Sequence, residues 1–280
     1  MGILVFGETG QVARELAHAP AVTCLNRQQA DLSDPAGCAA KIHEIRPEIV
    51  INAAAYTAVD AAEEHQDLAQ VINGDAPGAM AGACKELDIP FLHISTDYVF
   101  DGTGKSPWQV GDAVGPLGAY GRTKLAGERA IAAVGGRYVI LRTSWVFSPH
   151  GANFVKTMLR LGAERDQLSV VADQVGGPTA AADIARALLA VAKSYSAGYS
   201  GSGVYHYSGA PDVSWAAFAK EIFKQAGFQV TINDIGSDQF PTPATRPHNS
   251  RLSCTALEQD FAISRPDWRV SLSKVLAELP

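Results

Sequence analysis

The sequence is poor in cysteine, and its four cysteines are far apart and irregularly spaced: Cys24, Cys38, Cys84 and Cys254. No Cys-x-x-Cys pair occurs, and the seven histidines show no ligand spacing such as His-x-x-x-His. Zinc sites and disulfide frameworks need closely or regularly placed residues. The pattern therefore excludes a disulfide-stabilised small domain and argues against a catalytic metal, and we expect the cysteines to be reduced.

Long apolar runs and an excess of positive charge are also missing. No run reaches the roughly 18 apolar residues that span a membrane, and the opening run Gly2–Phe6 is too short for a signal peptide and lacks a basic flank. The net charge is −6, from 23 basic and 29 acidic residues, which argues against a surface for polyanions. We therefore expect a cytoplasmic protein that binds neither a membrane nor nucleic acid.

Through about residue 145, short apolar runs alternate with longer helical patterns. Strands are expected near Ile3-Phe6, Val22-Leu25, Ile49-Ile51, Phe91-Ser95 and Tyr138-Leu141, and helices near 11–18, 34–45, 67–87 and 119–134. This alternation is typical of a parallel sheet covered by helices on both faces. The sequence predicts an α/β protein with a Rossmann-type doubly wound sheet.

After Ser148 the pattern becomes α+β. Helices are expected near 153–163, 180–193, 214–226 and 272–279, and short strands near 168–171, 204–207 and 230–232. Loops are expected at 194–203 and 236–249. We therefore expect residues 1–148 to form a dinucleotide-binding Rossmann domain to which later segments return. Residues 149–280 would form mainly a smaller substrate-binding region.

A glycine-rich turn directly follows the first expected strand and opens a helix. Gly7 permits the tight turn, Gly10 lets a pyrophosphate approach the helix, and the small Ala13 allows close packing on the sheet. The spacing is Gly-x-x-Gly-x-x-Ala and departs from Gly-x-Gly-x-x-Gly, so a plain strand-to-helix turn is the alternative.

Cofactor choice is expected just beyond the second strand, where a carboxylate would favour a free ribose 2′-hydroxyl. Asn26 and Arg27 stand there, and Arg27 is able to pair with a 2′-phosphate. NADPH is therefore favoured, with NADH as the alternative. Asp31 and Leu32 would border the adenine or simply form a turn and helix start.

Tyr120 and Lys124 are four residues apart on the expected helix 119–134, so they share one face. A nearby ammonium stabilises a phenolate, and this lets a tyrosine act as a general acid or base. Taken alone, the spacing fits a solvated helix face equally well.

Six ordered motifs give these residues a context. They are Gly7-x-x-Gly-Gln-x-Ala13, Asn52-Ala-Ala-Ala-Tyr-Thr-Ala-Val-Asp60, Ser95-Thr-Asp-Tyr-Val-Phe-Asp-Gly102, Tyr120-Gly-x-Thr-Lys124, Leu141-Arg-Thr-Ser-Trp-Val-Phe147 and Asp173-Gln-x-Gly-x-Pro-Thr179. With them, essentially the whole chain resembles the dTDP-4-dehydrorhamnose reductase family of extended short-chain dehydrogenase/reductases.

The resemblance implies a catalytic triad of Thr96, Tyr120 and Lys124. Thr96 would donate to a carbonyl oxygen of a dTDP-sugar, and Tyr120 would give that oxygen a proton while NADPH supplies hydride. Lys124 would hold the nicotinamide ribose and lower the tyrosine pKa. The product in the family is dTDP-L-rhamnose, a precursor of polysaccharides.

The resemblance also implies the remaining contacts. The cofactor-binding positions are Gly7, Thr9, Gly10, Gln11, Val12, Arg27, Asp31, Leu32, Ala54, Ala55, Tyr56, Thr57, Tyr120 and Lys124, and the substrate-binding positions are Thr96, Asp97 and Trp145. The alternatives are a small-residue packing seam for the alanine run and a buried strand-end tryptophan for Trp145.

Some family members place Mg²⁺ between subunits using glutamates, and Glu15 stands at the matching position. An exposed helical glutamate is the alternative reading, and a homodimer fits the resemblance. The usual Asp-Lys-Ala-Glu of the family is here Asp60-Ala61-Ala62-Glu63, so Ala61 replaces the lysine, and Val110 replaces an acid; substrate choice therefore stays open.

Three functions stay open on the sequence. The first is reduction of the 4-keto group of dTDP-4-dehydro-L-rhamnose, and the second is another nucleotide-sugar 4-ketoreductase with a 6-deoxytalose-type product. The third is a noncatalytic regulatory subunit, like the relative that serves methionine adenosyltransferase. The intact Thr96, Tyr120 and Lys124 argue against the third.

The assignment of Arg27 leads to a first prediction. Arg27→Ala should raise the Michaelis constant for NADPH more than that for NADH, because only NADPH carries a 2′-phosphate for the guanidinium to pair with. Steady-state kinetics with both cofactors measure this difference. Equal effects on the two constants would refute the role.

Overall fold

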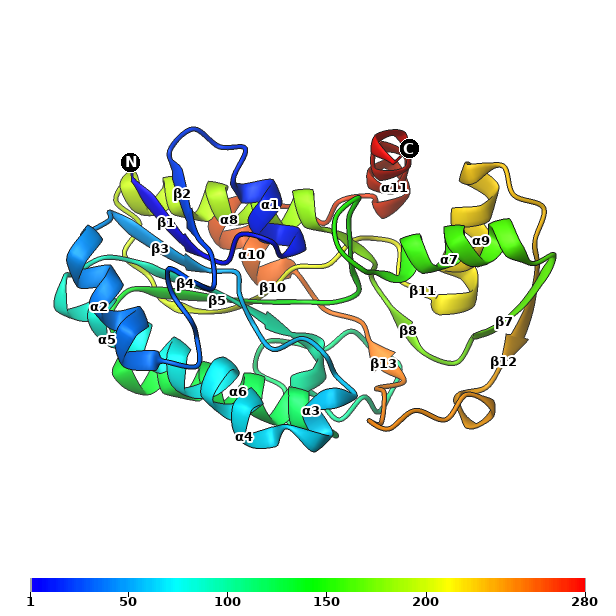
Figure 1. The fold of residues 1–280 in the computed structure, drawn as a ribbon, viewed down its shortest axis with the longest axis horizontal. Coiled ribbons are helices and arrows are strands. Elements are labelled where there is room, and N and C mark those ends of the chain that lie inside the picture. The colour runs from blue at the N-terminus through cyan, green and yellow to red at the C-terminus, as the bar shows by residue number, and fades with distance from the viewer. Residues whose placement is uncertain (1, 280) are drawn as a thin grey trace.

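Six parallel strands form the central sheet of the computed structural model, which describes residues 2–279 (Figure 1). Their order is β10-β5-β4-β3-β1-β2, and their bounds are β1 (Ile3–Phe6), β2 (Val22–Leu25), β3 (Ile49–Asn52), β4 (Phe91–Thr96), β5 (Tyr138–Thr143) and β10 (Gly203–His206). The predicted Rossmann-type fold is confirmed, and the five strands expected in the first half are all present. Met1 and Pro280, the outer limits of the two predicted regions, lie outside the described residues.

Helices cover both faces of this sheet, as its apolar strands require. On one face lie α1 (Gln11–Leu16), α8 (Ala181–Ser196) and α10 (Thr255–Phe261); on the other lie α2 (Pro35–Ile45), α5 (Ala76–Glu86) and α6 (Ala119–Val134) (Figure 1). Each layer of helices shares a buried core with the strands. Since β10, α8 and α10 come from beyond residue 148, late segments of the chain complete the central sheet and its cover.

A third core lies beyond one end of the sheet. It is built from α7 (Phe154–Glu164), α9 (Trp215–Ala226), α11 (Trp268–Glu278) and the parallel pair β7 (Gln167–Val171) and β12 (Thr231–Ile235). Short strands bridge this part to the rest: β6 (Val146–Phe147), β8 (Val175–Gly176), β9 (Thr179–Ala180), β11 (Val213–Ser214) and β13 (Asn249–Ser250).

Four local features differ from the predictions. The helix expected at 67–87 is divided into α4 (Gln66–Gln70), a π-helical turn η1 (Val71–Asp75) and α5, and a short helix α3 (Ala61–Glu64) precedes it. The expected loop 236–249 contains the 3₁₀ turn η3 (Ser237–Gln239) and ends in β13, and α10 was not predicted. These segments are ordered by contacts with distant parts of the chain, which local periodicity does not report.

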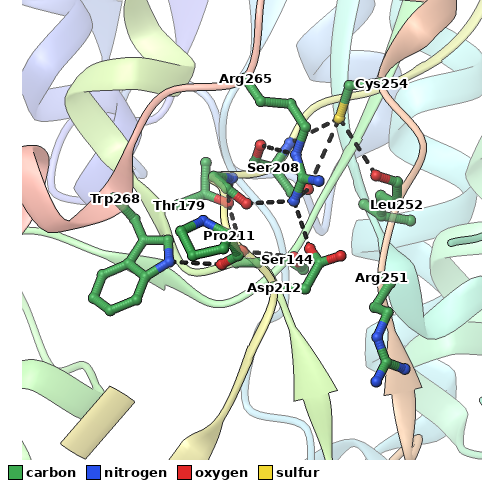
Figure 2. Close-up of polar contacts among 12 residues, drawn as sticks. Ser144, Thr179, Ser208, Pro211, Asp212, Arg251, Leu252, Cys254, Arg265 and Trp268 are labelled. Atoms are coloured by element: carbon green, nitrogen blue, oxygen red, sulfur yellow. Dashed lines mark hydrogen bonds and ion pairs between the residues drawn. The ribbon is translucent and has the colours of Figure 1, made fainter. Parts of the chain in front are cut away.

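A polar network joins the end of β5, the segment after β10 and the start of α11 (Figure 2). The Arg265 guanidinium donates to the Ser208 carbonyl and pairs with Asp212, and the Trp268 indole donates to the Pro211 carbonyl at 2.7 Å. Ser144, directly after β5, donates to the Gly177 carbonyl at 2.9 Å. The network thereby holds the strand end that leads into the third core.

None of the helices within residues 2–279 combines the length and the apolar character needed to cross a bilayer.

The contact between α6 and η1 yields a stability prediction. A Cβ atom at Gly127 would lie 2.1 Å from the Asn73 carbonyl oxygen, whereas one at Gly82 on α5 would meet no atom within 4 Å. Gly127→Ala should therefore lower the free energy of unfolding by about 1–3 kcal/mol, since the backbone has to shift. Gly82→Ala is the matched control and should be neutral or stabilise by up to about 1 kcal/mol.

Urea unfolding followed by circular dichroism measures both changes. Equal stability of the two variants would show that α6 and η1 do not pack as closely as described.

Candidate active site

A cleft of about 880 Å³ opens at the carboxyl ends of the central strands. This is the edge where open α/β sheets bind their ligands. With one exception, Glu15, every residue assigned a site role from the sequence lines it: Gly7, Thr9, Gly10, Gln11, Val12, Arg27, Asp31, Leu32, Ala54, Ala55, Tyr56, Thr57, Thr96, Asp97, Tyr120, Lys124 and Trp145. The fold thus gathers positions up to 138 residues apart around one space.

The glycine turn after β1 has the backbone form that a phosphate loop needs. Gly7 has a φ of 112°, and a Cβ there would lie 3.4 Å from Ala53 and Ala54. Gly10 precedes α1 in extended conformation and offers no side-chain cap. Gln11 is held from the other side of the cleft, because its side-chain oxygen accepts from Ser148 and Asn153.

Arg27 and Asp31 form a surface ion pair at the mouth of the cleft. The Arg27 Nε donates to Asp31 Oδ2 at 3.1 Å, and the Arg27 side chain is 76% exposed. Asp31 also accepts the backbone N–H of Ser33, which keeps the pKa of its carboxyl below the ordinary value. The carboxylate therefore competes with any 2′-phosphate for the guanidinium.

Asn73 ties the loop after β3 to the helix that carries Tyr120. Its amide accepts the Tyr56 N–H at 2.8 Å and donates both to the Tyr56 carbonyl and to the Thr123 hydroxyl. Asn73 is fully buried in the π-helical turn, a form often found at functional sites. The sequence interpretation missed it; the one available signal was a poor helix former in the middle of the expected helix 67–87.

The start of α6 is fixed by groups from other elements. The Ala119 N–H donates to the Glu63 carboxylate at 2.7 Å, which supplies the cap that Gly118 lacks. A Cβ at Gly121 would lie 2.2 Å from the Tyr98 carbonyl oxygen, so only glycine allows this approach to η2 (Asp97–Val99). Both contacts set the position of Tyr120 beside the end of β4.

Thr96 and Tyr120 meet inside the cleft. Burial raises the pKa of Tyr120 to about 12, with a hydrogen bond from Thr96 acting in the opposite direction and the Asp97 charge adding to the rise. The tyrosine is therefore a protonated phenol at neutral pH. This differs from the lowered pKa expected from the sequence, because burial is the largest effect on the phenol and only the hydrogen bond from Thr96 opposes it.

Lys124 is buried, with 2% of its surface exposed, and points under β4. Its Nζ lies 2.9 Å from His93 Nε2 and donates to the Ile94 carbonyl at 2.7 Å. Burial lowers the pKa of Lys124 to about 8, and the Glu128 carboxylate acts in the opposite direction. In this state the Lys124 side chain is therefore bound to His93 and Ile94 of β4, and it does not lower the pKa of the Tyr120 phenol.

The side of the cleft around Asp97 and Trp145 holds polar atoms without a partner. Among the described residues, neither Asp97 Oδ2 nor Thr143 Oγ1 has a hydrogen bond, although both are buried. Trp145 has a φ of 51° and stacks on Trp215 with ring centroids 3.6 Å apart. Trp215 and Thr143 were not predicted; Thr143 lies in the motif that was assigned only through Trp145.

Glu15 lies outside the cleft, and the reading of it as an exposed helical residue is wrong. Its side chain is 13% exposed and faces His150 Nε2 at 3.6 Å. Burial raises the pKa of the Glu15 carboxyl. Within residues 2–279 no cluster of three or more His, Cys, Asp or Glu side chains has the arrangement of a metal site.

Comparison with known proteins places the chain among relatives of one kind. The family model described as RmlD substrate binding domain matches residues 1–280. A protein of Sinorhizobium fredii named dTDP-4-dehydrorhamnose reductase is 43% identical over 99% of this chain and 97% of its own length. One of the same name from Escherichia coli K12 is 42% identical over 100% of this chain and 98% of its own.

Solved structures that are similar to this chain carry the same name as these relatives. A dTDP-4-dehydrorhamnose reductase from Clostridium acetobutylicum is 38% identical, with a TM-score of 0.93 over 99% of both chains. The enzyme of that name from Bacillus anthracis, solved in complex with NADP, is 34% identical, also with a TM-score of 0.93, over 99% of this chain and 100% of its own.

Asp97 generates a pH prediction. Burial raises its pKa from 3.8 to about 6, so the ionised carboxyl disfavours the folded state. The stability of the protein should fall as pH rises from about 4 to 6 and then level off. The stability of the Asp97→Asn variant should not fall over this range. Above pH 6 its free energy of unfolding should exceed that of the unmodified protein by up to roughly 3 kcal/mol.

Unfolding by urea at several pH values measures the difference. Parallel stability curves for the two proteins across this range would contradict it.

Proposed function

We propose how this chain, which belongs to the dTDP-4-dehydrorhamnose reductase family, performs its reaction in the cleft. The chain is an NADPH-dependent oxidoreductase that reduces the 4-keto group of dTDP-4-dehydro-L-rhamnose to give dTDP-L-rhamnose. The assignment of individual residues rests chiefly on one observation: a partly buried, protonated Tyr120 stands beside Thr96 at the carboxyl end of β4.

Tyr120 is the proton donor in this proposal. A phenol whose pKa is about 12 keeps its proton at neutral pH and passes it only to a strong base, such as the alkoxide oxygen that forms as the ketone is reduced. Bound NADPH supplies the hydride to the carbonyl carbon. Thr96 donates its hydroxyl to the same oxygen and so orients the ketone, and the two donors stabilise negative charge as it develops there.

The residues of the cleft fit a dinucleotide. The positive φ of Gly7 and the open backbone around Gly10 suit a pyrophosphate, and the small side chains of Ala54 and Ala55 leave room for a flat ring system. Thr9, Gln11 and Val12 complete the turn, while Leu32 and the pair Arg27 and Asp31 border the adenosine end. Lys124 would leave its contacts under β4 to hold the nicotinamide ribose.

The sugar would be held on the opposite side of Tyr120. Asp97 Oδ2 and Thr143 Oγ1 are buried and unpartnered in the described structure, so sugar hydroxyls would satisfy them. The stacked Trp145 and Trp215 offer an apolar wall with polar N–H edges, which suits a deoxysugar with a methyl group.

The other functions considered from the sequence are not favoured. Relatives about 40% identical over the full length are named as reductases of one substrate, and Thr96, Tyr120 and Lys124 are all in the cleft. The homodimer and the cytoplasmic location stay predictions, and no step of the mechanism uses them. No step of the mechanism uses Mg²⁺, and Glu15 lies outside the cleft, 3.6 Å from His150 Nε2.

The direct test is oxidation of NADPH in the presence of dTDP-4-dehydro-L-rhamnose, followed by identification of the product sugar. We expect loss of absorbance at the nicotinamide band and formation of dTDP-L-rhamnose. Formation of the 6-deoxytalose isomer would overturn the assigned stereochemistry. No oxidation of NADPH with any dTDP-4-keto-6-deoxyhexose would overturn the proposed chemistry.

The role of Tyr120 yields a separate prediction. Tyr120→Phe should lower kcat by roughly 10²-fold or more, since the proton donor is lost, and leave NADPH binding nearly unchanged. Tyr195→Phe is the matched control: it removes a buried hydroxyl that donates to the Gly201 carbonyl, on α8 and outside the cleft. Near-normal turnover in Tyr120→Phe would exclude Tyr120 as the donor.

A further inference from the structure

Lys124 ends a chain of buried hydrogen bonds that runs under the cleft. The Ala54 N–H donates to Asn52 Oδ1 at 3.1 Å, Asn52 Nδ2 lies 3.2 Å from His93 Nδ1, and His93 Nε2 lies 2.9 Å from Lys124 Nζ. Asn52, His93 and Lys124 are each at most 2% exposed. None of these three side chains belongs to the glycine turn or to the substrate side.

The direction of this chain follows from its first member. A backbone N–H is always a donor, so the Asn52 atom that faces Ala54 is the carbonyl oxygen, and the NH₂ group must face His93. His93 Nδ1 then accepts a hydrogen bond and carries no proton. A neutral imidazole has one N–H, which therefore sits on Nε2 and points at Lys124 Nζ.

An ammonium group has no lone pair, so it is unable to accept the His93 N–H. A neutral amine accepts it and still donates to the Ile94 carbonyl, as the 2.7 Å contact requires. The opposite arrangement, with a charged Lys124 donating to His93, would turn the Nδ1–H toward the Asn52 NH₂ group. Every consistent set of hydrogen bonds with His93 neutral and all members in place therefore has Lys124 as the acceptor.

We propose that Asn52 and His93 are positioning residues that hold Lys124 as a neutral amine until the cofactor binds, so that binding takes up one proton at Lys124 Nζ. The inference rests on the proposed function, in which Lys124 holds the nicotinamide ribose. The proton comes from the solvent: the His93-to-Lys124 hydrogen bond breaks, the amine becomes an ammonium, and this donates to the ribose oxygens.

Of the charged and titratable groups around Lys124, the Glu128 carboxylate favours the ammonium form, but Glu128 is paired with Arg142, and burial acts in the opposite direction and more strongly. Tyr120 and Glu128 lie on the same helix, His93 on β4, and Arg142 on β5, where it is paired with Glu128. Burial, the largest cause, keeps the pKa of His93 well below its usual range even without a charge on Lys124, so His93 stays neutral. Burial also lowers the pKa of Lys124 to about 8, and an N–H aimed at Nζ lowers it further.

The first test uses the cofactor-free protein and needs no variant. Proton-nitrogen correlation spectra of the ¹⁵N-histidine protein report which ring nitrogen carries the proton. His206 is an internal control: it is also fully buried and neutral, but its Nδ1 faces the Trp108 carbonyl and must carry the proton. We expect Nε2–H for His93 and Nδ1–H for His206. Nδ1–H at His93 would overturn the proposal.

The second test measures proton uptake when NADPH binds. Calorimetry in two buffers of different ionisation enthalpy should show uptake of up to about one proton per NADPH above pH 8. Affinity should fall by up to about tenfold per pH unit there, because the bound state holds the extra proton. NADPH binding without proton uptake would contradict the inference.

Asn52→Asp provides the matched variant. The carboxylate of this variant would accept hydrogen bonds from both the Ala54 N–H and a protonated His93 Nδ1. His93 Nε2 would then carry no proton and would accept a hydrogen bond from a charged Lys124, so the direction of the hydrogen bonds would be reversed. Proton uptake and the pH dependence of affinity should both disappear, while NADPH still binds. Proton uptake on NADPH binding that persists in this variant would refute the proposed direction of the hydrogen bonds from Asn52 to Lys124.

Failure of NADPH to bind the unmodified protein at any pH would overturn the proposed function instead. The position of the His93 proton in the cofactor-free protein would still show whether the hydrogen bonds from Ala54 to Lys124 have the proposed direction.

Discussion

The close packing of α6 against its neighbours is the constraint on which the rest of the site depends. Gly121 and Gly127 have no side chains, and both positions face backbone carbonyls that a Cβ would meet at 2.2 and 2.1 Å. This approach places Tyr120, which is partly buried, and Lys124, which is buried, beside the end of β4. The Glu63 cap and the Asn73 bridge hold the helix in that place from outside its own sequence.

Burial by this packing then sets the protonation state of each reactive group. It raises the pKa of Tyr120 to about 12 and that of Asp97 to about 6, and it lowers the pKa of Lys124 to about 8. Each shift favours the neutral form, as expected where water is excluded. The proposed mechanism needs a neutral phenol as its proton donor, and the packing around Tyr120 keeps the phenol in that form.

The late part of the chain completes the site from the other side. Trp215, at the start of α9, stacks on Trp145, which directly follows Ser144 at the end of β5. The Arg265 network anchors the neighbouring segments (Figure 2). The cleft therefore lies between the sheet and the third core, and its two sides come from parts of the chain that local sequence patterns treat separately.

Local sequence signals predicted the Rossmann-type fold, because the alternation of apolar residues and the glycine turn depend on neighbouring residues, whereas most positions of the cleft were assigned through the six motifs and the family that they resemble. Tertiary structure alone decided the charge states, the π-helical turn around Asn73 and the directional chain from Asn52 to Lys124. The spacing of Tyr120 and Lys124 suggested a charged partner for the phenol, whereas the fold directs the lysine under β4. Protonation depends on burial and on hydrogen-bond partners from distant strands, and neither is encoded in the spacing of residues along one helix.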